Sequence, residues 1–236
     1  VLGYAEMAVN FFVVEEGARE LLERYHLDNF DALWSLPHDW VEPINIRKGG
    51  WSGVVRVTRD GDTFYVKRQY RQTRRMRSFP WRSRPTYYHE FLALNRLAQA
   101  GVPVVQWLLY TERDDAAILV TREPSGFMDL KTLFEMTSGR RLQAAASRLG
   151  TALALMHGQR WQHGACYPAH LLIHPETLEV RMLDLERCRR RRSRAAASRA
   201  DLDQLSRRAG FLPPAALARI SDGAPGTARP VPASTF

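Results

Sequence analysis

The apolar residues of this 236-residue chain change their spacing near Pro124, and this change limits the folds that the chain can adopt. Before Pro124 they gather in short β-like runs, and Asp60-Gly61 between two of these runs is typical of a hairpin turn. The runs cover residues 44–47, 54–58, 63–67, 104–110 and 116–121. Farther along, the spacing becomes helical over residues 129–136 and 140–157. The sequence therefore predicts an α+β fold, with a strand-rich first half and a helical second half.

The first half also contains two segments with helical spacing. Residues 15–26 predict a short amphipathic helix, and a second helix begins at Thr86, which suits an N-cap position. We therefore expect a first domain at residues 8–121, in which a helix precedes a five-stranded sheet with one further helix. A helical domain at residues 122–214 follows. Residues 215–236, rich in Gly, Pro, Ala, Ser and Thr, predict a disordered tail.

The positive charge is concentrated in two segments. The chain carries 34 Lys and Arg against 25 Asp and Glu, a net charge of +9. Residues 67–84 contain eight of these cations and residues 187–199 contain seven, and neither segment contains an acid. Such segments bind polyanions such as nucleic acid, anionic lipid or phosphorylated glycans, unless they only form a solvated surface. Aromatic residues interleave with the arginines of the first segment, at Tyr70, Phe79 and Trp81.

The cysteine content and the lack of long apolar segments indicate the compartment. Cys166 and Cys188 are too few for a disulfide framework and are typical of reduced thiols. No stretch approaches the ~20 apolar residues of a membrane span, and the start of the chain has no secretory signal. We therefore expect a cytoplasmic protein.

Several polar residues follow one another in the order of the protein-kinase fold. Lys67 ends a β-like run and Glu90 lies in the next helix, so an ion pair between them would hold Lys67 against the phosphates of a nucleotide. Asp184 follows an apolar run and would hold a metal ion between phosphate oxygens. The glycines of a turn before the Lys67 strand would let backbone N–H groups approach phosphate. This turn contains Gly49, Gly50, Ser52 and Gly53.

Five stretches of the chain resemble the lipopolysaccharide core heptose/Kdo kinases, and within that family the weak-acid-inducible branch. They are Arg47-Lys48-Gly49-Gly50-Trp51-Ser52, Phe64-Tyr65-Val66-Lys67-Arg68-Gln69, His163-Gly164-Ala165-Cys166-Tyr167-Pro168-Ala169-His170, Leu183-Asp184-Leu185-Glu186-Arg187 and Asp201-Leu202-Asp203-Gln204-Leu205. The resemblance covers about residues 8–212. It implies a protein-kinase-like two-lobed fold with a minimal C-lobe. In that fold the backbone around Glu123 would meet adenine, and Asp201 would anchor the catalytic loop.

The resemblance also implies a function and its partners. It implies ATP-dependent phosphorylation of a heptose or Kdo hydroxyl of the lipopolysaccharide inner core, with ATP and Mg²⁺ as cofactors. The partners are then the lipopolysaccharide core or another anionic glycolipid, and the inner-membrane surface, where a cytoplasmic protein would bind peripherally. Nucleic acid is not favoured as a partner, because no nucleic-acid-binding motif accompanies the basic segments. The sequence leaves the modified hydroxyl and the oligomeric state open.

The predicted catalytic loop departs from the H-R-D-x-x-x-x-N pattern of kinases. His163 takes the place of the His, and His170 takes the place of the Asn, so His170 joins Asp184 as a predicted metal ligand. Gly164 replaces the Arg, and Ala165 replaces the Asp that accepts the proton of the substrate hydroxyl. The usual base of the reaction is therefore missing.

Two hypotheses account for the missing Asp. Phosphoryl transfer depends mostly on positioning and electrostatics, so a kinase without this base would react more slowly, with Glu186 or His163 as a substitute. The candidate catalytic residues are then His163, Asp184 and Glu186, although His163 also suits a core histidine that orients the loop. Alternatively, the chain is a catalytically impaired pseudokinase or a nucleotide- or lipid-binding stress protein.

Two further interpretations remain open at the level of sequence. Five possible zinc ligands lie within eighteen residues, at His157, His163, Cys166, His170 and His174. Their spacing matches no familiar zinc finger, so a structural zinc is the weaker interpretation. A nucleic-acid-binding protein is the third functional class, since arginines with interleaved aromatic residues also suit phosphate contacts and base stacking.

Overall fold

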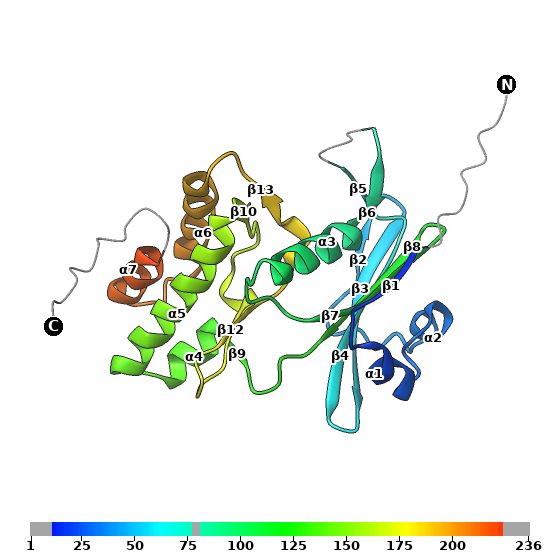
Figure 1. Cartoon of the computed structure of the whole chain (residues 1–236), viewed down its shortest axis with the longest axis horizontal. Helices are drawn as coiled ribbons and strands as arrows, with labels where there is room; N and C mark the ends of the chain where they lie inside the picture. The colour runs from blue at the N-terminus through cyan, green and yellow to red at the C-terminus, as the bar shows by residue number, and fades with distance from the viewer. Residues whose placement is uncertain (1–10, 77–80, 224–236) are drawn as a thin grey trace. The chain divides into compact units, whose positions relative to one another are not determined.

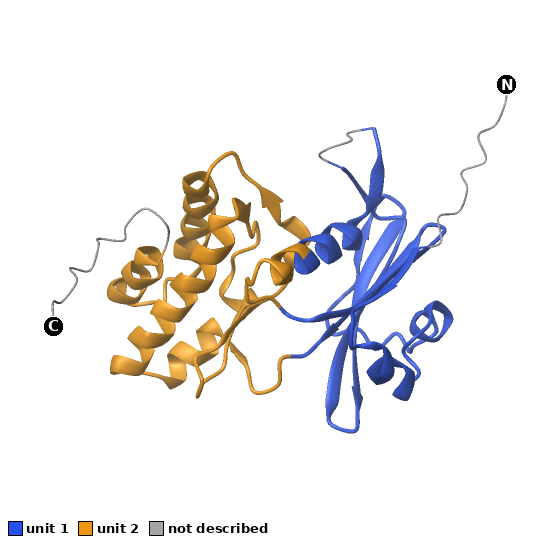
Figure 2. Cartoon of the chain, viewed as in Figure 1, with its two compact units in different colours: residues 1–95, 105–123 blue, residues 96–104, 124–236 orange. Residues whose placement is uncertain are grey.

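The computed structural model describes residues 11–76 and 81–223 of the chain. The chain divides into two compact units (Figure 2): residues 1–95 with 105–123, and residues 96–104 with 124–236. This division places the boundary two residues after the predicted end of the first domain. It also places the last turn of helix α3 (Thr86–Gln99) in the second unit.

A six-stranded antiparallel sheet with the strand order β1-β7-β8-β4-β3-β2 forms the body of the first unit (Figure 1). Its strands are β1 (Phe11–Val14), β2 (Asn45–Arg47), β3 (Gly50–Arg59), β4 (Asp62–Tyr70), β7 (Trp107–Arg113) and β8 (Ala116–Arg122). Two-residue turns at Lys48-Gly49 and Asp60-Gly61 join β2 to β3 and β3 to β4, and all four turn residues have positive φ. Such turns match the twist of paired strands, so they set the register of this meander.

Strand β1 and helix α2 (Phe30–Trp34) of the first unit were not predicted. Strand β1 is apolar without alternation, and it pairs at the sheet edge with β7, where Phe11 lies opposite Glu112. Helix α2 (Phe30–Trp34) follows a shortened α1 (Arg19–Arg24), and the Asn29 side chain caps α2 by accepting a hydrogen bond from the Ala32 N–H at 2.9 Å. Both helices pack on one face of the sheet, in a cluster that includes Leu22, Leu27, Leu33, Phe64 and Leu108.

Arg68 is fully buried and holds the segment after α2 against strand β4. Its guanidinium donates to the carbonyl oxygens of Trp34 at 2.6 Å, Leu36 at 2.8 Å and Pro37 at 3.1 Å, and lies 4.7 Å from the centre of the Trp40 ring. Burial lowers the pKa of Arg68. Arg68 belongs to the first basic segment, but it is a buried structural residue and adds no charge to the surface.

A two-stranded hairpin of β5 (Thr73–Arg75) and β6 (Ser83–Pro85) follows β4 and leads into α3. Arg84 of this hairpin binds Glu112 of β7 at 2.7 Å, and its guanidinium lies 4.0 Å from the centre of the Tyr88 ring. The predicted aromatic contribution of Phe79 to the basic segment lies outside the described residues.

The second unit is mainly helical, with α4 (Leu130–Met136), α5 (Gly139–Gly158), α6 (Arg194–Arg208) and α7 (Pro214–Asp222). Short elements between α5 and α6 hold the predicted catalytic loop. They are β10 (Trp161–Gln162), the 3₁₀ turn η1 (Pro168–His170), β11 (Leu171–Ile173), β12 (Val180–Met182), the 3₁₀ turn η2 (Leu185–Arg187) and β13 (Arg189–Arg190). Strand β9 (Met128–Asp129) and β12 flank β11, while β10 pairs with β13. No helix in the described part of the chain is long and apolar enough to cross a membrane.

The expectation of a disordered tail from residue 215 is wrong for its first residues, because Pro214–Asp222 forms helix α7. Ala216 and Ile220 are four residues apart on one helix face and are buried. Gly150 of α5 lets α7 approach closely, since a Cβ there would lie 2.8 Å from the Ile220 carbonyl oxygen. Residues 214–222 thus have the apolar spacing of an amphipathic helix, although the composition of this region predicted a disordered tail. Residues 224–236 of the predicted tail lie outside the described residues.

We predict that Arg68→Met lowers the free energy of unfolding by about 3 kcal/mol, because each carbonyl left without a donor costs about 1–3 kcal/mol. Urea unfolding monitored by tryptophan fluorescence measures the loss. Arg59→Met, at the exposed end of β3, is the matched control and should change stability little. Equal effects of the two substitutions would contradict the structural role of Arg68.

Candidate functional site

The structure brings together the predicted pair Lys67 and Glu90. Lys67 lies in β4, Glu90 lies in the first half of α3, and Lys67 Nζ is 2.6 Å from Glu90 Oε1. The Lys67 side chain is 15% exposed and the Glu90 side chain is 1% exposed. Taking two charges out of water is costly unless they meet in close contact. The pair therefore holds Lys67 in one position with part of its side chain accessible, and binding of phosphate by Lys67 stays a prediction.

A glutamine that the sequence analysis missed fixes helix α3 to β4. Gln69 Oε1 accepts a hydrogen bond from the Tyr87 N–H at 2.7 Å, and the Gln72 carbonyl accepts one from the Thr86 N–H at 3.0 Å. These bonds satisfy N–H groups at the start of α3 that have no partner within the helix. Because strand side chains alternate, Gln69 lies on the same face of β4 as Lys67, and this spacing was the available signal.

The glycine-rich segment is a tight turn followed by a strand, not an extended phosphate-binding loop. A Cβ at Gly50 would lie 2.5 Å from the Tyr70 carbonyl oxygen, and one at Gly53 would lie 2.7 Å from the Trp40 ring. Packing alone thus requires glycine at both positions. Gly49 has φ +76 and open space around it, and Ser52 lies in β3 opposite Gln69. A contact with phosphate by this segment stays a prediction.

Glu123 is engaged within the sheet of the first unit. Its carboxylate lies 3.2 Å from Arg56 Nη2 and 2.8 Å from the Tyr65 hydroxyl, and its N–H donates to the Thr63 carbonyl at 2.9 Å. Burial opposes ionisation of Glu123, but the hydrogen bonds from Arg56 and Tyr65 outweigh it and lower the pKa of the carboxyl. The predicted contact with adenine does not follow from this geometry and stays a prediction.

In the second unit, Asp201 of α6 holds the predicted catalytic loop by its backbone. Its carboxylate accepts hydrogen bonds from the His163 N–H at 2.7 Å and the Gly164 N–H at 3.0 Å, and it lies 3.0 Å from His157 Nε2. Asp201 is fully buried. A buried carboxylate is stable only when its oxygens are hydrogen-bonded. The anchor role that the resemblance implied is therefore what the geometry shows.

Gln204, one helical turn after Asp201, makes a second attachment that the sequence analysis missed. Its side-chain oxygen accepts the Cys166 N–H at 2.6 Å, and its amide nitrogen lies 3.5 Å from the Gly164 carbonyl. Residues three apart on a helix share a face, so the spacing to Asp201 was a usable signal. Burial raises the pKa of the Cys166 thiol well above its usual range, which opposes a thiolate ligand.

The surroundings of His163 bear on its predicted role as a base. Its side chain is fully buried, and its Nδ1 accepts a hydrogen bond from the Ala165 N–H at 3.3 Å. Burial lowers the pKa of His163 to about 4, with opposing effects from Asp201, and the ring is therefore neutral near pH 7. This environment favours the alternative in which His163 orients the loop, and a catalytic role for His163 stays a prediction.

Glycine at position 164, where kinases have Arg, has a steric cause. Gly164 has φ +79, and a Cβ there would lie 2.5 Å from the Arg187 carbonyl oxygen. Ala165, at the position of the missing Asp, is 2% exposed. The loop is therefore packed tightly against η2.

His170 and Asp184 lie together at the end of the loop. His170 Nε2 is 3.4 Å from Asp184 Oδ2, and the two side chains are 20% and 34% exposed. Asp184 adopts a left-handed backbone conformation with φ +56 and makes no capping hydrogen bond with its side chain. A non-glycine residue in this conformation is uncommon and is often found at functional sites. Glu186, two residues later in η2, is half-buried, and its role as a base stays a prediction.

The His170 and Asp184 side chains fit a metal ion that takes most of its ligands from a bound molecule and water. They do not fit an ion enclosed by protein side chains. Within the described ranges, no group of three or more His, Cys, Asp and Glu side chains could hold a metal. Hence the structure offers no support for the zinc site that the histidines suggested. Mg²⁺ is commonly bound through one or two carboxylates together with phosphate oxygens and water, so the Asp184 carboxylate fits it.

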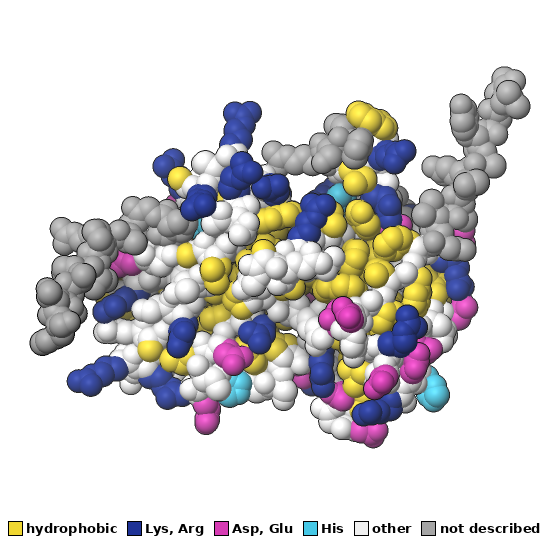
Figure 3. All heavy atoms as spheres, in the orientation of Figure 1, with side chains coloured by type: hydrophobic (Ala, Val, Ile, Leu, Met, Phe, Trp, Pro, Cys, Tyr) yellow, Lys and Arg dark blue, Asp and Glu magenta, His cyan; other side chains and the backbone are white. Residues whose placement is uncertain are grey.

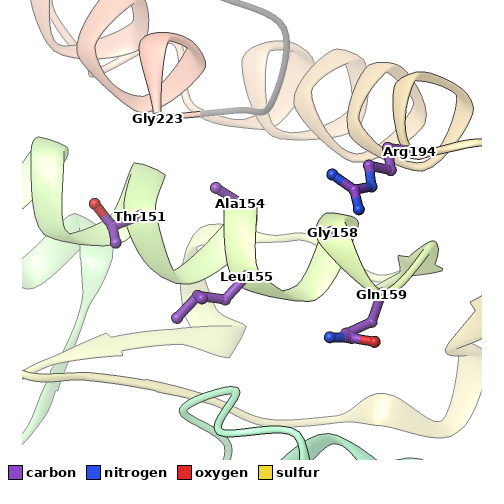
Figure 4. A pocket seen from close by; sticks show the side chains of 7 residues that line it. All are labelled: Thr151, Ala154, Leu155, Gly158, Gln159, Arg194 and Gly223. Carbon is purple, nitrogen blue, oxygen red and sulfur yellow. The ribbon is translucent and has the colours of Figure 1, made fainter. Parts of the chain in front are cut away.

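The second unit also has a shallow hollow of about 310 Å³ between α5, the start of α6 and the end of α7 (Figure 4). Thr151, Leu155 and Gly158 line it on α5, and the Arg194 guanidinium extends toward it from α6. None of the predicted site residues lines this hollow. Each unit therefore holds its own set of candidate residues: the Lys67–Glu90 pair in the first unit, and the Asp201-anchored loop with Asp184 in the second.

A sheet with a buried Lys–Glu pair and a helical unit with a His-led loop define a protein-kinase-like chain. The model of the Lipopolysaccharide kinase (Kdo/WaaP) family matches residues 31–222, and the chain belongs to this family. It is 33% identical to Protein InaA of Escherichia coli (strain K12), over 76% of this chain and 88% of that protein. These matches confirm the predicted family and its weak-acid-inducible branch.

A solved structure shares the fold. The structure titled WaaP in complex with acyl carrier protein aligns with a TM-score of 0.64 at 21% identity, over 90% of this chain and 88% of that chain. The predicted kinase-like fold is therefore confirmed.

We predict that stability falls as the pH is lowered from about 7 to about 4, because the buried His163 stays neutral while the unfolded chain takes up a proton near pH 6.5. Between about pH 6.5 and about pH 4 the unfolded state binds more protons than the folded state. The stability that depends on a neutral His163 is therefore fully present above about pH 6.5 and is lost as the pH falls toward about 4. Its size is about 3 kcal/mol at most. Urea unfolding across this range measures it, and His163→Gln should flatten the profile. An unchanged slope in this variant would contradict the burial of a neutral ring.

Proposed function

We propose that this chain transfers the γ-phosphate of ATP to a heptose or Kdo hydroxyl of the lipopolysaccharide inner core. The observation that carries the proposal is the ion pair of Lys67 and Glu90, 2.6 Å apart, in a chain of the lipopolysaccharide kinase family. A partly accessible ammonium held by a buried carboxylate is the arrangement with which kinases position nucleotide phosphates. Membership of a kinase family supports ATP as the phosphate donor.

Each part has a separate role in the proposal. Lys67 would bind phosphate oxygens and neutralise charge as it develops on them. Asp184 would ligate a divalent ion, which when bound supplies positive charge to the phosphates. Asp201 and Gln204 would keep the loop backbone in one conformation while a sugar hydroxyl approaches. Preorganised groups stabilise a transition state because they need no rearrangement during the reaction.

A catalytically impaired nucleotide-binding protein is the second candidate, and one observation favours it. Ala165 stands where kinases have the catalytic Asp, and the neighbouring His163 is buried and neutral. A positioned base contributes about 10²–10⁴-fold to a rate. The loose transition state of phosphoryl transfer requires little proton removal before bond cleavage, so we favour a slow kinase over an inert one.

We predict that the purified protein labels isolated lipopolysaccharide inner core with phosphate from γ-labelled ATP. Lys67→Ala and Asp184→Asn should each lower the initial rate by about 10²-fold or more, because each removes a charge that acts on the transferred group. Lys131→Ala is the matched control, since Lys131 forms an exposed ion pair with Glu135 in α4. Labelling that survives both active-site changes would contradict the proposed site. No labelling by a protein that binds ATP would favour the impaired alternative.

The first basic segment supports an anionic membrane surface as a partner. Fewer of its arginines are available for this contact than the sequence suggested. Arg68 is buried, Arg84 pairs with Glu112, and Arg71 pairs with Asp115 at 2.8 Å. Exposed Arg75 and Arg82 remain on the β5–β6 hairpin, beside a Trp81 side chain that is 77% exposed. Tryptophan favours the headgroup region of a membrane, and each nearby arginine adds about 1 kcal/mol of attraction to anionic lipid.

The second basic segment supports an anionic acceptor. Arg187, Arg189, Arg192, Arg194 and Arg199 are exposed, over η2, β13 and the start of α6. Figure 3 shows basic side chains gathered over this part of the second unit. This segment begins three residues after Asp184, so phosphate groups on an acceptor would meet arginines next to the proposed metal ligand.

We predict that the hairpin contributes to binding of vesicles that contain anionic lipid. The double substitution Arg75→Glu with Arg82→Glu should weaken binding by about tenfold or more in co-sedimentation, and Trp81→Ser should weaken it at high salt as well. Arg19→Glu with Arg59→Glu makes the same charge change at exposed sites outside the hairpin and serves as the control. Equal losses in both double variants, or preferential binding of DNA over vesicles, would contradict a specific membrane role for the hairpin.

A further inference from the structure

The contact between His170 and Asp184 contains a mismatch of hydrogen-bonding groups. His170 Nδ1 lies 2.8 Å from the Ala165 carbonyl oxygen, and His170 Nε2 lies 3.4 Å from Asp184 Oδ2. A carbonyl oxygen can only accept a hydrogen bond, so Nδ1 must carry the proton. In a neutral imidazole the other nitrogen, Nε2, then presents a lone pair.

That lone pair faces a carboxylate, which also has only lone pairs to offer. Two acceptors repel one another unless a cation lies between them or the imidazole takes a second proton. The distance suits a shared ion, because neighbouring donors around an ion with bonds of about 2.1 Å lie about 3 Å apart. Both side chains are partly exposed, so an ion can reach them.

The surroundings of His170 match those of a metal-bound histidine. Such histidines almost always donate their second ring N–H to a carboxylate or a backbone carbonyl, which fixes the tautomer and the ring orientation. The Ala165 carbonyl does this for His170. Ala165 is itself held in place, because the loop on either side of it is attached to Asp201 and Gln204.

We infer that His170 Nε2 and Asp184 Oδ2 form a mixed nitrogen–oxygen site that selects Mn²⁺ over Mg²⁺. Mg²⁺ prefers oxygen ligands in near-ideal octahedral geometry and gives up water reluctantly. Transition ions accept imidazole nitrogen, and Mn²⁺ also suits carboxylate, water and phosphate oxygens. The inference rests on the proposed function for the identity of the bound phosphates, but the selection between metals is a property of these two side chains.

Titration of the full chain with Mn²⁺ alone, followed by electron paramagnetic resonance of the free ion, tests this inference without nucleotide or turnover. We expect one site that binds Mn²⁺ at least about tenfold more tightly than Mg²⁺, with Mg²⁺ measured by competition. His170→Asn replaces the ring nitrogen by an amide and should weaken Mn²⁺ binding by about 10–100-fold, while Mg²⁺ binding changes less. His26→Asn is the matched control, because His26 is exposed and its positive φ tolerates Asn.

A measurement on the wild-type protein guards against misfolding of the variant. Pulsed electron paramagnetic resonance should detect coupling of bound Mn²⁺ to an imidazole nitrogen, and this signal should persist in His26→Asn. Equal affinity for the two metals, absence of nitrogen coupling, or no metal binding by the folded wild type would each overturn the inference. A protein that binds Mn²⁺ as expected but neither binds ATP nor labels lipopolysaccharide would contradict the proposed function alone.

Discussion

The carboxylate of Asp201 is the group on which the second unit's candidate site depends. It lies on a long helix, without exposure to solvent, and binds two consecutive backbone N–H groups of the loop and the ring of His157. Because its oxygens are satisfied only by this loop conformation, the loop cannot rearrange without leaving a buried charge unpaired. The position of His170, and through it the environment of Asp184, follows from this attachment.

The tightly packed loop gives a physical account of the two unusual residues in it. Gly164 is required because the Arg187 carbonyl lies where a side chain would begin. The Ala165 carbonyl accepts a hydrogen bond from the His170 ring, and the Ala165 N–H donates one to the His163 ring. Both backbone polar groups of Ala165 are therefore hydrogen-bonded to side chains. The loop therefore has a fixed backbone conformation while lacking the Asp that kinases place in it. The missing Asp would therefore lower the rate of the proposed phosphoryl transfer, and it would not prevent nucleotide binding.

Local signals were enough to predict much of the fold. The strands around Asp60-Gly61 follow from turn chemistry. The helix near Thr86 follows from its apolar spacing and not from the predicted N-cap, because Thr86 is its first helical residue and donates its hydroxyl to the Gln72 carbonyl. Lys67 could be matched with Glu90 because their order along the chain is informative. Strand β1 and helix α7 depend on distant partners, Tyr110 for Val13 in the sheet and Gly150 for Ile220, so local spacing was a weak guide. Gln69 and Gln204 were missed for the same reason, since each acts by binding a backbone group of another element.

The proposed contact of Lys67 with the phosphates of a nucleotide can be measured by calorimetric titration of the full chain with ATP and a divalent ion. We predict saturable binding of one nucleotide per chain by the wild type. Lys67→Met should weaken it by about 10–100-fold, because a charged hydrogen bond contributes about 1.5–3 kcal/mol, whereas Lys131→Met should leave it unchanged. No binding by the folded wild type, or equal binding by Lys67→Met, would contradict both the kinase and the impaired-kinase interpretations.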